Sequence, residues 1–249
     1  MTEDRRFRQW DKWLDAIYED VSHLVIGRHI YEEVRKIIAS NARLHQPSSF
    51  YDLMAMTFSA WSAMAVRRQR DNRSISLVRL LGEVEKHPEI ISRERFVDTF
   101  ASKMIAGFGG ATATPESELL SGGGAYVPTR AEVEAIAHKN FDRLVAPNAQ
   151  QLDPERIRME SDELRAKAKS LEHFASKKIA HLDEQTPEIP TLPELDACTA
   201  AFEAIVLRYM MLLRASAPAQ ILPTWQYDWK AVFREAWLPE QRSVSGQDR

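Results

Sequence analysis

Apolar residues recur every three or four positions along most of the chain, and this spacing constrains the fold more than any other feature. In residues 8–44 the repeat is carried by nine apolar residues: Trp13, Ile17, Val21, Leu24, Val25, Ile30, Val34, Ile37 and Ile38. Residues three and four apart lie on one face of an α-helix. No segment alternates apolar and polar residues as a half-buried β-strand does. We therefore predict an all-α protein, a helical bundle.

Six further segments show the helical spacing. They span residues 50–71, 74–87, 92–105, 129–147, 153–184 and 194–215. Ser48 or Ser49 is the expected N-cap of the first of these. That segment is apolar on most sides between Leu53 and Val66. We therefore expect this helix to lie in the centre of the bundle.

Two later helices have additional start signals. Thr129, with Glu132 three positions on, forms a capping-box sequence. Asp153 followed by Pro154 provides an N-cap and a first-turn proline for the segment 153–184. We expect this segment to be one long, uninterrupted helix that ends before a group of prolines.

The chain of 249 residues is long enough for one sizeable core, so we expect a single domain over residues 1–249. Six of the nine glycines lie between residues 107 and 124, which predicts a flexible loop insertion at 107–128. The C-terminal segment 223–240 is rich in aromatic residues and is expected to dock its rings onto the bundle. Its aromatic residues are Trp225, Tyr227, Trp229, Phe233 and Trp237.

Composition argues against several classes of protein. The 33 Lys and Arg against 36 Asp and Glu leave a formal charge of -3, so contact with RNA would need a local basic patch. The single cysteine, Cys198, has no partner for an internal disulfide. No apolar run approaches the roughly 20 residues of a membrane span. The charged N-terminus lacks the apolar core of a secretion signal, so we expect a cytoplasmic protein.

No metal or cofactor is predicted. His23 and His29 are six residues apart and do not share a helix face, and no Cys or His cluster has zinc spacing. The glycine-rich segment lacks the preceding strand and the Lys-Ser or Lys-Thr pair of a phosphate-binding loop.

Four arginines are concentrated where the helix at 50–71 ends: Arg67, Arg68, Arg70 and Arg73. Such a concentration is suited to contact with RNA phosphates. A dense run of charges is more commonly a helix end that is exposed to solvent. Both interpretations stay open at the level of sequence.

His181 follows Lys177 and Lys178 near the proline-terminated end of the segment 153–184. Histidine titrates near neutral pH and cations stabilise phosphoryl oxygens, so these three residues are candidates for a catalytic site. The structural alternative is that they interact with the negative end of the helix dipole, which favours cations in the last turn.

Three stretches of the chain, taken together, resemble a known family. They are "SKKIAHLDE" at 176–184, "RRQRDNRSISLVRLLGEV" at 67–84 and "QYDWKAVFREAW" at 226–237. The chain resembles the AbiU-type branch of the HEPN superfamily, all-helical proteins tied to abortive infection and toxin systems in bacteria. The likeness runs from about residue 13 to residue 237 and is interrupted by the glycine-rich segment. It implies a HEPN-like helical bundle.

The members of this superfamily that cut RNA are metal-independent endoribonucleases. Their motif is an Arg followed, after four to six residues, by the His. His181 matches the family's catalytic His, whereas Phe174, Ala175 and Ser176 occupy the positions where the Arg would stand. Lys177 would supply charge but lacks the planar fork of an arginine. The motif is therefore degenerate.

The resemblance implies two functions of different classes. The first is RNA cleavage in a phage-defence or toxin system, with His181 as acid or base and Lys177 or Lys178 neutralising charge. It also implies a homodimer in which two motif-bearing helices meet at a symmetry axis. The second is a non-catalytic bundle that binds RNA, an antitoxin or another protein. An enzyme with an unrelated site beside the glycine-rich segment is a third class, for which the sequence names no residues.

Overall fold

The computed structural model describes residues 2–110, 128–180 and 190–235. In these ranges the chain forms seven α-helices: α1 (Glu3–Ser40), α2 (Ser49–Arg70), α3 (Leu77–Lys86), α4 (Arg93–Gly110), α5 (Arg130–Leu144), α6 (Pro154–Phe174) and α7 (Leu192–Arg214). The shorter elements are the 3-10 helices η1 (Ala42–Leu44), η2 (Pro88–Ile90) and η4 (Trp229–Arg234) and the π-helix η3 (Ala175–Ala180). The described residues contain no β-strand, which confirms the prediction of an all-α helical bundle.

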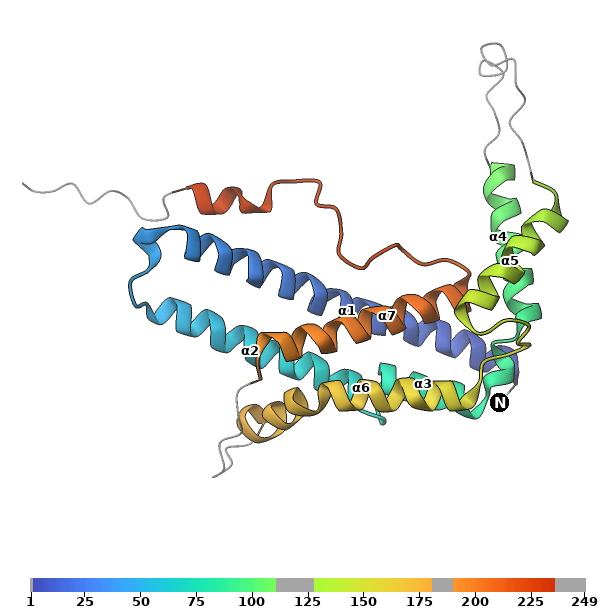
Figure 1. The fold of residues 1–249 in the computed structure, drawn as a ribbon, viewed down its shortest axis with the longest axis horizontal. Helices are drawn as coiled ribbons and strands as arrows, with labels where there is room; N and C mark the ends of the chain where they lie inside the picture. The colour runs from blue at the N-terminus through green and yellow to red at the C-terminus, as the bar shows by residue number, and fades with distance from the viewer. Residues whose placement is uncertain (1, 111–127, 181–189, 236–249) are drawn as a thin grey trace, which may run out of the picture.

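The helix α1 runs along the length of the molecule (Figure 1) and packs against α7 and α2. The helix α6 packs against α7, α3 and α2. Helices α4 and α5 pair with each other at the end of the bundle that holds the N-terminus (Figure 1). The core-facing side of α1 follows the predicted spacing up to Val25, and the predicted residues buried there are Trp13, Ile17, Val21, Leu24 and Val25. Burial of each such side chain stabilises the fold by about 1.5–3 kcal/mol. The last four predicted residues, Ile30, Val34, Ile37 and Ile38, are only partly buried.

The predicted caps of three helices are confirmed. Ser48 caps α2, because its side chain accepts a hydrogen bond from the Phe50 N–H at 3.2 Å. Asp153 caps α6 in the same way at 3.0 Å. The capping box of α5 is complete: Thr129 accepts from the Glu132 N–H at 3.4 Å, and the Glu132 carboxylate accepts from the Thr129 N–H at 2.8 Å. These bonds satisfy N–H groups that the first helical turn leaves without partners.

Several boundaries differ from the prediction. The first helix spans Glu3–Ser40 instead of 8–44, and its last predicted residues form η1. The helix α4 continues through Gly110, so the first four residues of the predicted insertion 107–128 are helical. Residues 111–127 lie outside the described residues. Lys103, Met104 and Ala106, just before this stretch, are good helix formers, and each glycine weakens a helix by only about 1 kcal/mol.

The helix predicted over 153–184 is interrupted. Regular α-helix ends at Phe174, and the next six residues form the π-helix η3. Residues 181–184 lie outside the described residues. Phe174 and Ala175 are both buried and form a small cluster with Ala63 of α2. This packing therefore falls at the transition from α6 to η3.

The prediction that α2 lies in the centre of the bundle is wrong for one side of its N-terminal half, residues 49–61, although Phe58 in this half is buried. There Phe50, Leu53 and Met56 are 56%, 58% and 66% exposed. In the C-terminal half, residues 62–70, Ala63 and Val66 are buried, because α6 and η3 pack on α2. The hairpin of α1 and α2 extends past α6 and α7 (Figure 1), so these helices do not cover the first turns of α2.

The aromatic C-terminal segment docks two of its tryptophans onto α1, as predicted. Trp225 stacks on His29 with the ring centroids 5.2 Å apart, and Trp229 meets the same ring edge-on at 6.5 Å. Tyr227 instead is 70% exposed. Trp237 lies outside the described residues.

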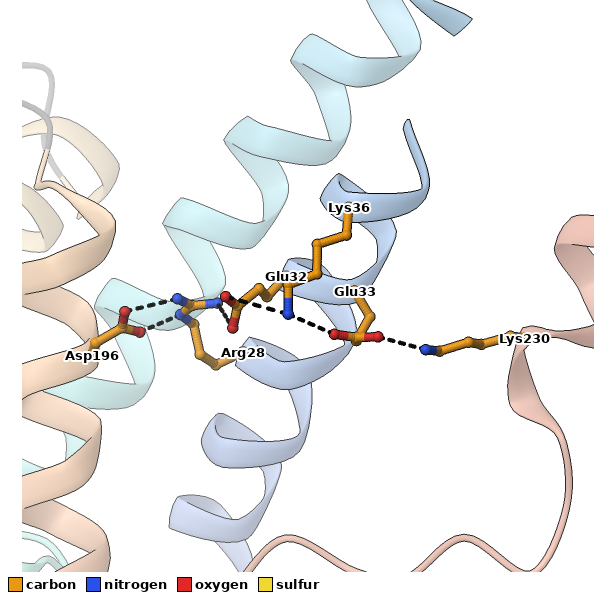
Figure 2. Close-up of polar contacts among 6 residues, drawn as sticks. All are labelled: Arg28, Glu32, Glu33, Lys36, Asp196 and Lys230. Carbon is orange, nitrogen blue, oxygen red and sulfur yellow. Dashed lines mark hydrogen bonds and ion pairs between the residues drawn. The ribbon is translucent and has the colours of Figure 1, made fainter. Parts of the chain in front are cut away.

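A row of charged side chains joins α7, α1 and η4 (Figure 2). Its members are Asp196, Arg28, Glu32, Lys36, Glu33 and Lys230. Arg28 donates to both carboxylate oxygens of Asp196, one of them at 2.8 Å. At the other end Lys230 pairs with Glu33. Hydrogen bonds from Lys230 and then Lys36 lower the pKa of Glu33 to about 2. The pair of Lys230 and Glu33 therefore attaches the C-terminal segment to α1. Trp225 and Trp229 pack against His29 of the same helix.

Candidate functional site

The four arginines predicted to bind RNA lie at the C-terminal end of α2 and in the loop that follows it. The loop is held by Asp71, whose carboxylate accepts hydrogen bonds from the Arg73 N–H at 2.9 Å and the Ser74 hydroxyl at 2.8 Å. These two donors lower the pKa of Asp71, in that order of effect. The backbone carbonyl of Arg73 accepts from Arg79 at 2.8 Å. The position of Arg73 beside the helix end is therefore set by local hydrogen bonds.

An open groove of about 760 Å³ lies between this helix end and α6. Its lining residues are Met64, Arg67, Arg68, Arg70, Asp71, Asn72, Arg73, Ser74, Arg165 and Glu172. Five of these side chains are arginines and two are carboxylates. The structure thus brings all four predicted arginines together and adds a fifth from α6. We call this feature the arginine groove.

Among the arginines that line the groove and form ion pairs, Arg70 is the least exposed. Its side chain is 16% exposed and pairs with Glu172 of α6. Its Nε is buried and has no hydrogen-bond partner among the described residues. Burial and then the repulsion from Arg165 lower the pKa of Arg70. An anion placed between Arg70 and Arg165 would relieve this repulsion.

Arg68 is tied to the body of the bundle. Its guanidinium donates to both carboxylate oxygens of Asp20 on α1. Gln69 donates to the same carboxylate at 2.7 Å, and its own carbonyl accepts from the Leu77 N–H at 3.0 Å. These bonds join α1, α2 and the start of α3. Arg68 therefore contributes to the shape of the arginine groove and is partly neutralised by Asp20.

Arg165 is the residue of the groove that sequence analysis did not identify. It lies on α6 and is half-exposed, with Asp162 at 3.8 Å. Arg165 and Glu172 are seven residues apart, so they face the same side of α6. That spacing is visible in the sequence, but it does not indicate that this side of α6 faces the end of α2.

The predicted catalytic lysines are not among the residues that line the arginine groove. Lys177 and Lys178 lie on η3, and both are exposed. His181, the third predicted catalytic residue, lies outside the described residues. The described part of the chain therefore places the candidate RNA-binding residues together and leaves the candidate catalytic site untested.

Within residues 2–110, 128–180 and 190–235, no group of three or more His, Cys, Asp or Glu side chains is arranged to hold a metal ion. No helix in these ranges is long and apolar enough to cross a membrane. Comparison with models of protein families, with curated proteins and with solved structures finds no match to this chain. The resemblance to the HEPN superfamily accordingly stays a prediction from sequence motifs.

Proposed function

We propose that this chain binds RNA through the phosphate backbone, and that the arginine groove is the binding site. The observation that carries the proposal is the convergence of five arginines from α2, its following loop and α6 on one open groove. A guanidinium matches a phosphate with two parallel donors, and arginine is the usual choice for this contact. The net charge of the whole chain is -3, so the groove is a local concentration of positive charge on a mildly acidic protein.

The lining of the groove supports recognition that does not depend on base sequence. None of its lining residues is aromatic, so stacking of bases, which is the common device of single-strand binding proteins, has no platform there. Contacts to phosphate fix position and carry no base information. We place this binding activity in a HEPN-like protein of a phage-defence or toxin system, as the sequence resemblance implies.

Binding is tested by fluorescence anisotropy of a labelled single-stranded RNA at several salt concentrations. The informative variant is Arg67→Ala/Arg73→Ala, because neither side chain forms an ion pair in the described part of the chain. The control is Arg35→Ala/Arg43→Ala, which removes the same charge from exposed positions at the other end of the α1–α2 hairpin. Arg68 and Arg70 are left intact since both have structural ion pairs.

The groove variant should lose about tenfold or more in affinity, and its slope of log K against log salt should shrink by about 1.4, which corresponds to two lost phosphate contacts on single-stranded RNA. The control should change little. Equal effects of the two variants, or no binding by the wild type at low salt, would refute the proposal.

RNA cleavage by His181 is the second candidate function. The observation that favours it is η3, because π-helical turns are rare and are frequently found at functional sites. This element presents exposed Lys177 and Lys178 immediately before His181 in the sequence. The degenerate motif argues the other way, since a missing preorganised charge costs about a hundredfold or more in rate.

Cleavage is tested by incubating the protein, without added metal, with a pool of structured and single-stranded RNAs. Products with cyclic phosphate ends that disappear in His181→Ala would support a 2'-hydroxyl attack on the neighbouring phosphate. Intact RNA with both proteins, each still able to bind RNA, would leave binding as the function.

A further inference from the structure

The N-terminal half of α2 carries an apolar face that is open to solvent. It consists of Phe50, Leu53, Met56 and Trp61, which are 56%, 58%, 66% and 37% exposed. The first three are spaced by three residues and form one row on the helix surface. Trp61 is three turns after Phe50 on the same side of the helix. We call these four residues the α2 apolar face.

The surroundings of this face set it apart from other exposed apolar residues. Asp52 is the only charged residue from Ser49 to Val66. Helix faces that remain in water normally carry charges. Met159 of α6 is also 66% exposed, but it stands between Arg158 and Glu160. Single exposed apolar residues are ordinary, whereas a contiguous patch marks an interaction surface.

The exposed area fits an interface between two chains. With roughly 200 Å² for each complete side chain, the exposed fractions leave about 400 Å² of apolar surface on one copy. Two copies would contribute about 800 Å², and flanking polar residues would bring the total towards the 1,200–2,000 Å² of a standard interface. We propose that two copies of this chain pair through the α2 apolar face around a twofold axis.

A second copy suits this face better than a membrane surface does. In a twofold pair the same patch meets itself, so an uncharged row of large side chains is self-complementary. Helices that lie on membranes carry Lys and Arg beside their apolar face, and α2 has none from Ser49 to Val66. The sequence resemblance implies pairing through the motif-bearing helix, which corresponds to α6. The exposed surface favours α2 instead.

The pairing would leave the arginine groove accessible. Arg70 is on the last turn of α2, about 20 Å along the helix from Met56, so the centre of the apolar face is well separated from Arg70. A pair would present two grooves to one RNA and would gain affinity through the linkage of the two sites. This consequence rests on the proposed RNA binding, whereas the pairing itself does not.

The test is the mass of the RNA-free full-length protein, measured by sedimentation over a range of micromolar concentrations. We expect the wild type to reach twice the 28.5 kDa of one chain. Met56→Glu should weaken pairing by about a hundredfold or more, because it buries a charge without a partner at the centre of the contact. Met159→Glu is the matched control: it changes the same residue type at the same exposure, on α6, and should leave the mass unchanged.

Leu53→Lys provides an independent variant with the opposite charge, and circular dichroism checks that each variant is folded. Wild-type protein that stays at the mass of one chain would overturn the proposal, whether the face is then covered by another part of the chain or by nothing. A pair that tolerates both α2 variants, or that is lost equally with Met159→Glu, would also overturn it. RNA binding by the separated variants tests the groove separately.

Discussion

The two halves of α2 differ in how much of their apolar surface the rest of the chain covers. In the C-terminal half, Ala63 and Val66 are buried against neighbouring helices, and the helix ends in the arginine groove. In the N-terminal half, Leu53 and Met56 are mostly exposed. The α1–α2 hairpin extends past α6 and α7 (Figure 1), which cover only one end of it. Apolar composition therefore indicates that a helix surface is to be buried. The lengths and positions of the other helices decide whether the same chain buries it.

The largest expected effect is the difference in cost between removing a covered and an open phenylalanine of the N-terminal half of α2. Phe58 is 9% exposed and stacks on Tyr31 with ring centroids 3.9 Å apart. Phe58→Ala should lower the free energy of unfolding by about 3–5 kcal/mol. Phe50→Ala, eight residues earlier, should change it by no more than about 0.5 kcal/mol. Urea denaturation of both variants measures the two losses in stability. Similar losses would mean that Phe50 is also covered in solution.

A smaller effect is expected where the Trp61 ring of α2 packs against Gly27 of α1. A Cβ added at Gly27 would lie 2.5 Å from the Trp61 ring. Gly27→Ala should therefore cost about 1–3 kcal/mol in steric conflict, which exceeds the gain of about 1 kcal/mol in helix propensity. Gly82→Ala on α3 is the control, since an added Cβ there meets no atom within 4 Å. Gly82→Ala should raise the free energy of unfolding, whereas Gly27→Ala should lower it. Urea denaturation measures both changes, and a stabilising effect of Gly27→Ala would contradict the expected steric conflict.

The first turn of α2 is stabilised by its N-cap, Ser48. Ser48→Ala removes the acceptor of the Phe50 N–H and should lower the free energy of unfolding by about 1 kcal/mol. Ser49→Ala is the control, because this residue is already inside the helix. Equal effects of the two substitutions in urea denaturation would indicate that the exposed half is frayed and that its cap contributes nothing to global stability.

The smallest effect concerns the C-terminal segment, which covers another face of α1. The pKa of Glu33 is lowered from 4.5 to about 2, chiefly by Lys230. A lowered carboxylate pKa contributes stability that is present above the ordinary pKa and is lost as pH falls through the folded value. The contribution of this pair should therefore persist at neutral pH and vanish between about pH 4.5 and pH 2.

Glu33→Gln should remove that contribution, so the stability of the variant and the wild type should converge as pH falls to about 2. The urea midpoint measured across this range is the test. A constant difference between the two proteins over the whole range would show that the ion pair does not hold the segment.

Much of the local structure follows from signals within a few residues. The caps at Ser48, Thr129 and Asp153 stand where the sequence predicts them, and the buried row of α1 follows the three- and four-residue spacing. The candidate site was predicted in part: the density of arginines after Val66 indicated it, while Arg165 joined it from α6. Lys177 and Lys178 are close to His181 in sequence but do not line that groove.

The sequence by itself determined that the chain is helical and where most of its helices begin, because capping bonds and helical hydrogen bonds join residues at most a few positions apart. Only the tertiary structure decided which part of α2 is covered, that α6 changes to a π-helix at Ala175, and that Arg165 lines the same groove as Arg70. These features depend on the lengths and relative positions of helices that are far apart in the chain, and no short-range pattern records how such helices pack.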